Sequence, residues 1–251
     1  MEEIVIFEGE SQAFLQPENG GLVNRFITDG RDILFPQQIF QTKNGLKKRG
    51  GIPILFPNAD PITESTDIFH LKQHGFAREE KWNVDQVIKN RAALTLNSDE
   101  ESKKQYPFDF ILNLEVKVED NQLSYILKII NPSLTEVLPV SPGFHPYFYV
   151  PVKDKKNIQI DLPGFDPSTY DFSSTLSFPQ QKIVNLKLPD GKNIRIEVSD
   201  NFKNWMVWSE PDKPFICLEP WVGKRNALLH PEERINIKPQ MQVELSMCLF
   251  V

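Results

Sequence analysis

The sequence predicts an all-β protein, a large antiparallel β-sandwich, from three observations. Apolar residues recur at every second position over most of the chain, for example across residues 110–117. The 20 prolines and 12 glycines interrupt these runs at intervals typical of turns. No stretch carries the apolar spacing of a helix of three turns. Many short strands that do not alternate with helices favour antiparallel sheets packed face to face.

Two strand pairs give the clearest signals. Residues 110–117 alternate between apolar and polar, residues 119–122 form a predicted turn, and residues 123–130 supply the partner strand. Residues 183–188 and 194–198 flank Asp190-Gly191, a dipeptide strongly associated with hairpins. Further strands are predicted at residues 4–7, 13–15, 22–27, 84–88, 92–96, 158–162, 205–208, 215–219, 235–237 and 243–250. About fifteen strands exceed what one sheet comfortably holds, so we expect two large sheets in a single sandwich domain over residues 1–251.

Composition limits the partners and the compartment. A formal net charge of −6 and a pI near 5.4 disfavour nucleic acid or an anionic membrane as the main partner. Cys217 and Cys248 form no disulfide framework, which fits a reducing compartment. The acidic first residues lack a signal-peptide pattern, and no run of about 18 apolar residues is present. We expect a cytoplasmic protein, a monomer or weak dimer, that binds a small molecule.

The segment around His145 is the most informative one. His145 lies in an aromatic cluster, between Phe144 and Tyr147, and precedes Pro146. Proline restricts the residue before it, so the backbone of His145 is stiffened. An imidazole held in this way among aromatic rings suits proton transfer near neutral pH. The alternative is a partly buried structural histidine at the end of a strand.

A second segment ends in Glu219. Strand alternation points Phe215, Cys217 and Glu219 to one face, and the apolar residues between them to the other. A carboxylate in apolar surroundings has a raised pKa, because burial disfavours its charge, and so becomes a useful base near pH 7. The alternative is a glutamate at the rim that pairs with Lys224 or Arg225.

Two glycine-containing segments supply candidate ligand-binding residues. His74 and Arg78 flank the Gly-Phe-Ala sequence and would provide two polar donors from one short segment. Arg49 precedes two glycines, and its guanidinium suits bidentate contacts to phosphate or sugar oxygens. The neighbouring Lys47 and Lys48 are interpreted as solvated surface residues.

Other chemistries lack their motifs. His70 and His74 have the spacing of a metal pair on a helix, but the residues between them lack the glutamate of the zinc protease motif. Neither standard glycine-rich phosphate loop is present, which disfavours a nucleotide. There is no Gly-x-Ser-x-Gly elbow, and neither cysteine lies in a known nucleophile signature.

Taken together, the four segments resemble the aldose 1-epimerase (galactose mutarotase-like) superfamily. The closest resemblance is to its hexose-6-phosphate mutarotase (glucose-6-phosphate 1-epimerase) branch. The segments that carry it are RGGIP with FP at 49–53 and 56–57, HGFAR at 74–78, FHPYF at 144–148 and LEPW at 218–221. One departure is that residues 58–60 read Asn-Ala-Asp, where that family often has an aromatic residue and a glycine.

The resemblance implies an antiparallel β-sandwich that interconverts the α and β anomers of a sugar without cofactor or metal. It implies that His145 is the general acid and Glu219 the general base. Opening a hemiacetal requires removal of the proton on the anomeric hydroxyl and donation of one to the ring oxygen, which an imidazolium and a carboxylate can perform. Aromatic residues such as Phe76, Trp208 and Trp221 could pack on the sugar, or belong to the core.

The resemblance also implies a set of substrate-binding residues. His74 would help to hold the ring-oxygen side of the sugar. Arg49 and Arg78 would face the ligand, at its phosphate if the sugar is phosphorylated. Asp171 would bind a sugar hydroxyl, although Asp166 competes with it for that role.

Two other functions remain open on this fold. One is a non-catalytic sugar or sugar-phosphate binding protein, since fold does not fix function. The other is a glycoside hydrolase or lyase, and such hydrolases usually need two facing carboxylates. Only Glu219 has a setting that suits this chemistry, with Asp171 or Asp166 as weaker partners.

Overall fold

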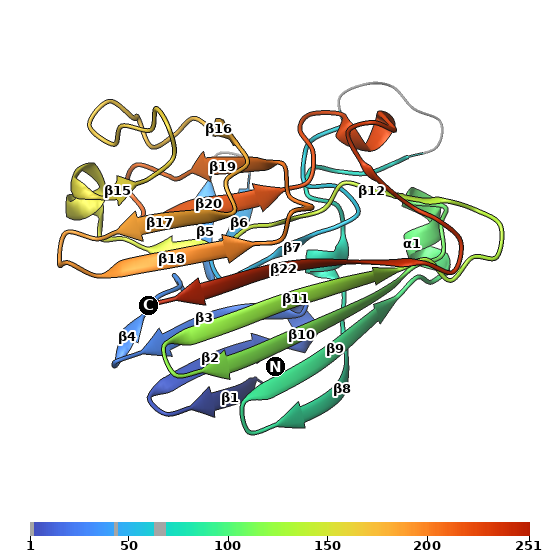
Figure 1. Cartoon of the computed structure of the whole chain (residues 1–251), viewed down its shortest axis with the longest axis horizontal. Helices are drawn as coiled ribbons and strands as arrows, with labels where there is room; N and C mark the ends of the chain where they lie inside the picture. Colours follow the sequence, from blue (N-terminus) through green and yellow to red (C-terminus); the bar gives the residue numbers. More distant parts are fainter. Residues whose placement is uncertain (1–2, 43–44, 63–68) are drawn as a thin grey trace.

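The computed structural model describes residues 3–42, 45–62 and 69–251, and most of their regular structure is β-strand (Figure 1). Within these residues there is one α-helix, α1 (Glu100–Gln105), whose first turn is closed by a capping box between Asp99 and Ser102. Short 3₁₀ helices lie at η1 (Pro17–Asn19), η2 (Ala77–Glu79), η3 (Val152–Asn157) and η4 (Ala227–Leu229). None of the helices in this part of the chain is long and apolar enough to cross a membrane.

The larger sheet has eight strands, each antiparallel to its neighbours. Its order is β15 (Gln159–Ile160), β17 (Ile183–Lys187), β18 (Asn193–Val198), β22 (Gln242–Phe250), β11 (Gln122–Ile130), β10 (Ile111–Glu119), β9 (Arg91–Asn97) and β8 (Asn83–Ile88). Along β10 and β11 every second side chain is buried, as the sequence predicts. The predicted turn is a two-residue loop in which Asn121 adopts a φ of 57°.

A six-stranded sheet carries the segments singled out by the sequence. Its order is β16 (Leu176–Pro179), β19 (Asn204–Trp208), β20 (Phe215–Trp221), β13 (Gly143–Phe144) and β7 (Ile54–Leu55), and β14 (Tyr147–Tyr149) also pairs with β20. Thus β13 and β14 lie on the same edge of β20, one opposite each end of it. The two residues between them, His145 and Pro146, lie opposite the middle of β20.

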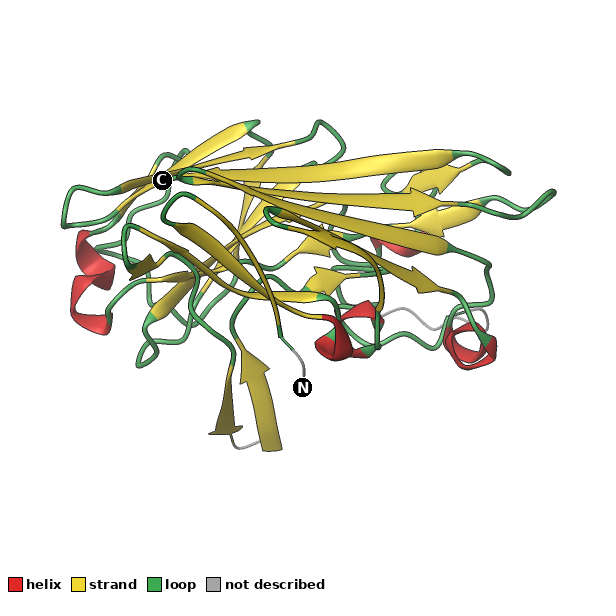
Figure 2. Ribbon diagram, turned by 90° about the horizontal axis from the view of Figure 1, so that it is seen from below, coloured by secondary structure: helices red, strands yellow, loops and turns green. Residues whose placement is uncertain are grey.

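The remaining strands form smaller sheets. Four strands at the N-terminus pair in order, β1 (Ile4–Glu8), β2 (Ser11–Gln16), β3 (Leu22–Thr28) and β4 (Arg31–Asp32). A two-stranded sheet joins β12 (Leu138–Val140) and β21 (Ile235–Ile237), and another joins β5 (Gln38–Thr42) and β6 (Gly45–Arg49). The β5–β6 hairpin projects from the body of the molecule (Figure 2).

One hydrophobic cluster joins the sheets into the sandwich. It includes Phe26 from β3, Leu114 from β10 and Ile216 from β20, each essentially inaccessible to solvent. Burying a side chain of this size contributes about 1.5–3 kcal/mol, so this common core is the main source of stability. The predicted all-β antiparallel fold is confirmed.

Several short strands escape the sequence-based prediction. The β5–β6 hairpin is largely exposed on both faces and therefore lacks a regular apolar alternation. Strands β7, β13 and β14 have two or three residues each and are buried except at Tyr149, so they are too short to show a period. These missed elements surround the candidate site.

Candidate active site

Strand β20 presents two different faces. Ile216 and Leu218 belong to the main core, whereas Phe215 and Cys217 pack in a separate small cluster with Tyr147. Glu219 lies on the same face as Cys217, and that face opens into a pocket. This is the alternation that the sequence predicts for this segment.

Strand register brings His145 and Glu219 together. On one edge of β20, Tyr147 pairs with Cys217 and Gly143 pairs with Trp221. The same register, continued through the gap between β13 and β14, sets His145 directly opposite Glu219. Their side chains therefore share a face, with His145 Nε2 3.4 Å from Glu219 Oε2. The exposed fractions of the two residues are 5% and 2%, respectively.

Aromatic rings fix the orientation of the His145 imidazole. Its ring stacks on Tyr147 at a centroid distance of 4.6 Å and an interplanar angle of 3°. Trp208 stands perpendicular to it at 6.0 Å, and His74 meets it edge-on at 5.4 Å. Glu219 is oriented by Trp221, whose indole Nε1 donates to Glu219 Oε2 over 3.1 Å. Within the described part of the chain, Glu219 Oε1 has no hydrogen-bond partner.

Burial shifts the pKa values of both groups toward their neutral forms. It raises the pKa of Glu219 to about 8, against the opposing effects of the Trp221 hydrogen bond and the charge of Arg78. Burial also lowers the pKa of His145 well below its ordinary value, and the nearby His74, Arg78 and Arg49 lower it further. Near pH 7 the pair therefore holds one dissociable proton, which these pKa shifts favour on the carboxyl group.

His74 is held by a tight turn. It adopts a φ of 72°, and the following Gly75 has a φ of 60°. A Cβ on Gly75 would lie 2.0 Å from the carbonyl oxygen of Phe56, so only glycine fits. His74 Nδ1 lies 2.6 Å from the carbonyl oxygen of Ala59. Because a carbonyl only accepts, Nδ1 carries the hydrogen and Nε2 is an acceptor. Burial lowers the pKa of His74 to about 3, so the ring is neutral.

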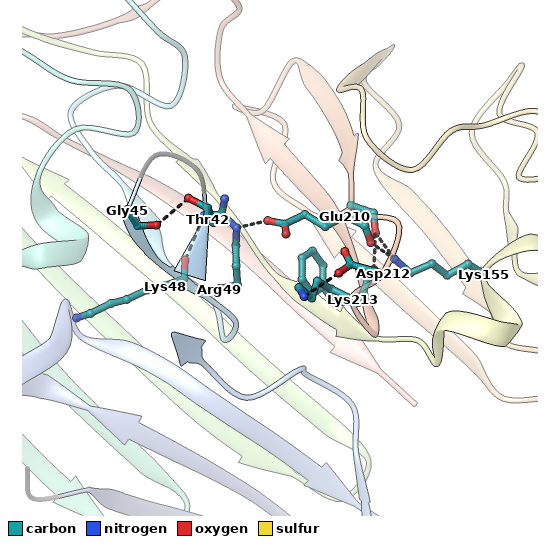
Figure 3. A network of polar contacts seen from close by, with 10 residues as sticks. Thr42, Gly45, Lys48, Arg49, Lys155, Glu210, Asp212 and Lys213 are labelled. Atoms are coloured by element: carbon teal, nitrogen blue, oxygen red, sulfur yellow. Dashed lines mark hydrogen bonds and ion pairs between the residues drawn. The ribbon is translucent and has the colours of Figure 1, made fainter. Parts of the chain in front are cut away.

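The two candidate arginines have different surroundings. Arg49 ends β6 and donates through Nε to Glu210 Oε1 over 2.7 Å (Figure 3). Its guanidinium lies 5.0 Å from the ring centre of Trp208. Arg78 lies in η2 and is half-buried, and among the described residues its guanidinium has no hydrogen-bond partner. Arg78 therefore keeps all its donors available for a ligand.

These groups line one pocket of about 490 Å³. The remaining lining residues are mostly polar or aromatic. The full set is Lys47, Arg49, Lys72, Gln73, His74, Arg78, His145, Tyr147, Thr175, Trp208, Glu219 and Trp221. Among these residues, which all belong to the described chain, Glu219 is the one carboxylate. The hydrolase hypothesis requires a second carboxylate, which this pocket does not supply.

Comparison with known proteins gives the family. Residues 17–205 match the aldose 1-epimerase family. The chain belongs to this family. It is 24% identical to the plasmid LacX protein of Lactococcus lactis subsp. lactis, over 76% of this chain and 80% of that protein. It is 34% identical to a protein of Cenchrus ciliaris that is provisionally named glucose-6-phosphate 1-epimerase, over 83% of this chain and 67% of that protein.

Solved structures share the fold of this chain. The Slr1438 protein of Synechocystis sp. PCC 6803 superposes with a TM-score of 0.85 at 28% identity, covering 99% of this chain and 95% of that one. A galactose mutarotase related enzyme of Lactobacillus acidophilus has the same fold, with a TM-score of 0.83 at 19% identity and coverages of 99% and 97%.

Asp171 and Asp166 lie outside the pocket. Asp171 is exposed, and its carboxylate accepts hydrogen bonds from the backbone and hydroxyl groups of Ser173 and Ser174. These bonds hold the pKa of Asp171 well below its usual range. Asp166 is bound in the same way by Ser168. In this aldose 1-epimerase family member the segment reaches the pocket through Thr175 instead, so we assign no sugar contact to either aspartate.

Other sequence-based expectations need adjustment. Phe76 is part of the core, whereas Trp208 and Trp221 line the pocket. His74 offers an acceptor where the sequence predicts a donor. Tyr147 was not singled out, although its position two residues after His145 on a strand places it on the same face.

The unusual residues 58–60 still support the site. Ala59 provides the carbonyl that fixes His74. The side-chain amide of Asn58 donates to the carbonyl oxygens of Asp60 and Lys72 over 2.7 and 3.2 Å. The departure from the family pattern therefore preserves the geometry of the turn that carries His74.

One group of side chains has ligand atoms close enough to share a metal ion. Among the described residues, His145, Cys217 and Glu219 bring one ligand atom each within 4.8 Å of one another. Burial raises the pKa of the Cys217 thiol and keeps it protonated, and the charges of Arg49 and Arg78 oppose a cation. The group is better suited to holding a proton than a metal ion.

Proposed function

We propose that this protein interconverts the α and β anomers of a hexose 6-phosphate, with Glu219 as general base and His145 as general acid. The observation that supports this most directly is the pairing of a buried imidazole with a buried carboxyl group in a pocket that also contains unpaired arginine donors. The membership of the aldose 1-epimerase family supports the reaction class.

In the proposed reaction Glu219 removes the proton from the anomeric hydroxyl while His145 donates one to the ring oxygen. The bond between C1 and the ring oxygen breaks and an open-chain aldehyde forms. Both oxygens are bonded to C1 in the closed ring, so they are close enough to meet two neighbouring side chains. Rotation about the C1–C2 bond and the reverse transfers then close the ring as the other anomer.

The proton balance of this step matches the pair of side chains. With a closed sugar, Glu219 is a carboxylate and His145 an imidazolium. After ring opening, Glu219 is a carboxylic acid and His145 is neutral. The pKa shifts that burial produces favour this second state. Hydrogen bonds from substrate hydroxyls stabilise the Glu219 carboxylate, in addition to the bond from Trp221 that is already present, so the two states approach each other in energy.

The other lining residues orient the substrate in this proposal. His74 Nε2 accepts a hydrogen bond from a sugar hydroxyl, and the faces of Trp208 and Trp221 pack against C–H groups of the ring. Arg78 and Arg49 bind the phosphate, because a guanidinium forms strong charge-assisted bonds to phosphate oxygens. The provisional name of the Cenchrus ciliaris relative supports a phosphorylated substrate.

Anomer exchange measured by NMR tests both parts of the proposal. The protein should accelerate exchange of glucose 6-phosphate well above the buffer rate, and exchange of glucose more weakly. Arg78→Ala should raise KM for glucose 6-phosphate about tenfold or more, because one charge-assisted contact is worth about 1.5–3 kcal/mol. Its effect on glucose should be small. Equal effects on both sugars contradict the phosphate assignment, and no acceleration of either contradicts the function.

A further inference from the structure

A second pocket adjoins the candidate active site across a shared wall. It has a volume of about 450 Å³ and shares Lys47, Arg49, Arg78 and Tyr147 with the first pocket. We call this second pocket the annex. Its other lining residues come from η1 and the turn after it, the start of β3, the segments before β5 and β7, strand β6 and η2: Asn19, Gly20, Leu22, Gln37, Leu46, Lys48, Pro53 and Glu79.

The annex is strongly positive. Four of its lining residues are Lys47, Lys48, Arg49 and Arg78, and Glu79 is the one acid among the lining residues. The charge of Glu79 is already partnered by an ion pair with Lys72, which does not line the annex. A concave surface of this kind concentrates anions in a protein whose overall formal charge is −6.

Lys48 is held in place at the far side of the annex. Strand alternation turns Lys48 to the face of the hairpin opposite Arg49, and its side chain extends away from the Arg49–Glu210 pair (Figure 3). Its Nζ donates to Asn19 Oδ1 over 2.6 Å. Asn19 has an exposed fraction of 7%, and its amide nitrogen donates to Gln16 and Gln37. The lysine is therefore anchored by a buried amide and is more than a solvated surface charge.

We propose that the annex binds a second phosphoryl group, so that the pocket pair accepts an anion with two or more linked phosphoryl groups. This inference rests on the proposed phosphate contacts of Arg49 and Arg78. One phosphoryl group binds at the shared wall, and the next extends into the annex toward Lys48. Such an anion competes with the sugar phosphate, because both use the same two arginines.

Calorimetric titration with phosphate, pyrophosphate and tripolyphosphate tests the inference at fixed ionic strength. The affinity of the unaltered protein should rise at least about tenfold from phosphate to tripolyphosphate. Lys48→Gln should abolish most of this gain and leave both phosphate affinity and anomer exchange unchanged. The matched control is Lys81→Gln, which removes the same charge from a nearby lysine. Lys81 pairs with Glu18 of η1 and does not line the annex.

The outcomes separate the two proposals. If phosphate binds but a longer chain adds nothing, or if both lysine variants lose the gain equally, the annex is not a phosphoryl site. If phosphate itself neither binds nor inhibits exchange, the phosphate contacts of the proposed function are wrong, and the annex proposal is wrong with them. Competitive inhibition by tripolyphosphate that Lys48→Gln weakens supports the inference.

Discussion

At the scale of single residues, the proposed reaction depends on two buried side chains that would each be costly to ionise alone. His145 and Glu219 lie opposite each other, and one proton serves both. A buried charge is tolerated only when it is paired. The pairing therefore explains how a carboxyl group and an imidazole can both remain at positions that are almost inaccessible to solvent.

Replacing Glu219 separates binding from turnover. Glu219→Gln keeps the shape of the side chain but removes the proton acceptor, so anomer exchange should fall by about 10²–10⁴ in kcat. KM for the sugar should change little, because the arginines and His74 remain. Exchange spectroscopy measures the rate, and calorimetry measures the binding. Unchanged turnover in this variant contradicts the role of Glu219.

The pH dependence of kcat/KM follows from the same pair. The pKa of His145 lies well below its ordinary value of 6.5, and the pKa of Glu219 is about 8. The pair therefore carries one dissociable proton at every pH between these two pKa values. For glucose, whose charge is constant, kcat/KM should be level over this range and fall above about 8 as the last proton leaves. The buffer rate is subtracted at each pH. An inflection near 4.5 with no loss above 8 contradicts the raised pKa of Glu219.

At the scale of elements, the turn that carries His74 is the most demanding piece of backbone. Gly75→Ala should lower the free energy of unfolding by roughly 1–3 kcal/mol more than the control, because it adds a clash with Phe56 to the backbone strain. The control is Gly164→Ala, at a φ of 86° with open space around it. Urea denaturation measures both. Equal losses would show that the contact with Phe56 is unimportant.

The elements differ in how well the sequence predicts them. The long strands β10, β11 and β22 alternate strictly, because one face packs on the core, and their positions were predicted closely. The pairing of His145 with Glu219 was inferred only by resemblance, since β20 is buried along its whole length and β13 has only two residues, so neither has an alternation that could set the register. The position of Asp171 outside the pocket lining has a local cause, because the neighbouring Ser173 and Ser174 donate hydrogen bonds to its carboxylate.

At the scale of the whole molecule, the contribution of Glu219 to the free energy of unfolding depends on pH. The pKa of Glu219 is raised from 4.5 to about 8 by folding. Its contribution to the free energy of unfolding is fully present below pH 4.5 and is lost as the pH rises to about 8. Stability of the unaltered protein relative to Glu219→Gln should therefore decline from pH 5 to 8. Urea denaturation of both proteins at several pH values measures this relative stability. A relative stability of the unaltered protein that increases with pH contradicts the raised pKa of Glu219.

The proposed contact with the phosphate and the proposed proton transfer involve different elements, because Arg49 lies in the β5–β6 hairpin and Glu219 in β20. The hairpin is fastened to the rest of the molecule by few contacts, chiefly those of Phe40 with Phe35, Arg49 with Glu210 and Lys48 with Asn19. In the proposed proton-transferring pair, by contrast, Glu219 lies in strand β20 and His145 lies opposite it, between β13 and β14. Changes in the length or charge of this hairpin could therefore alter the proposed substrate contacts of Arg49 during evolution. Such changes would leave the positions of His145 and Glu219 intact.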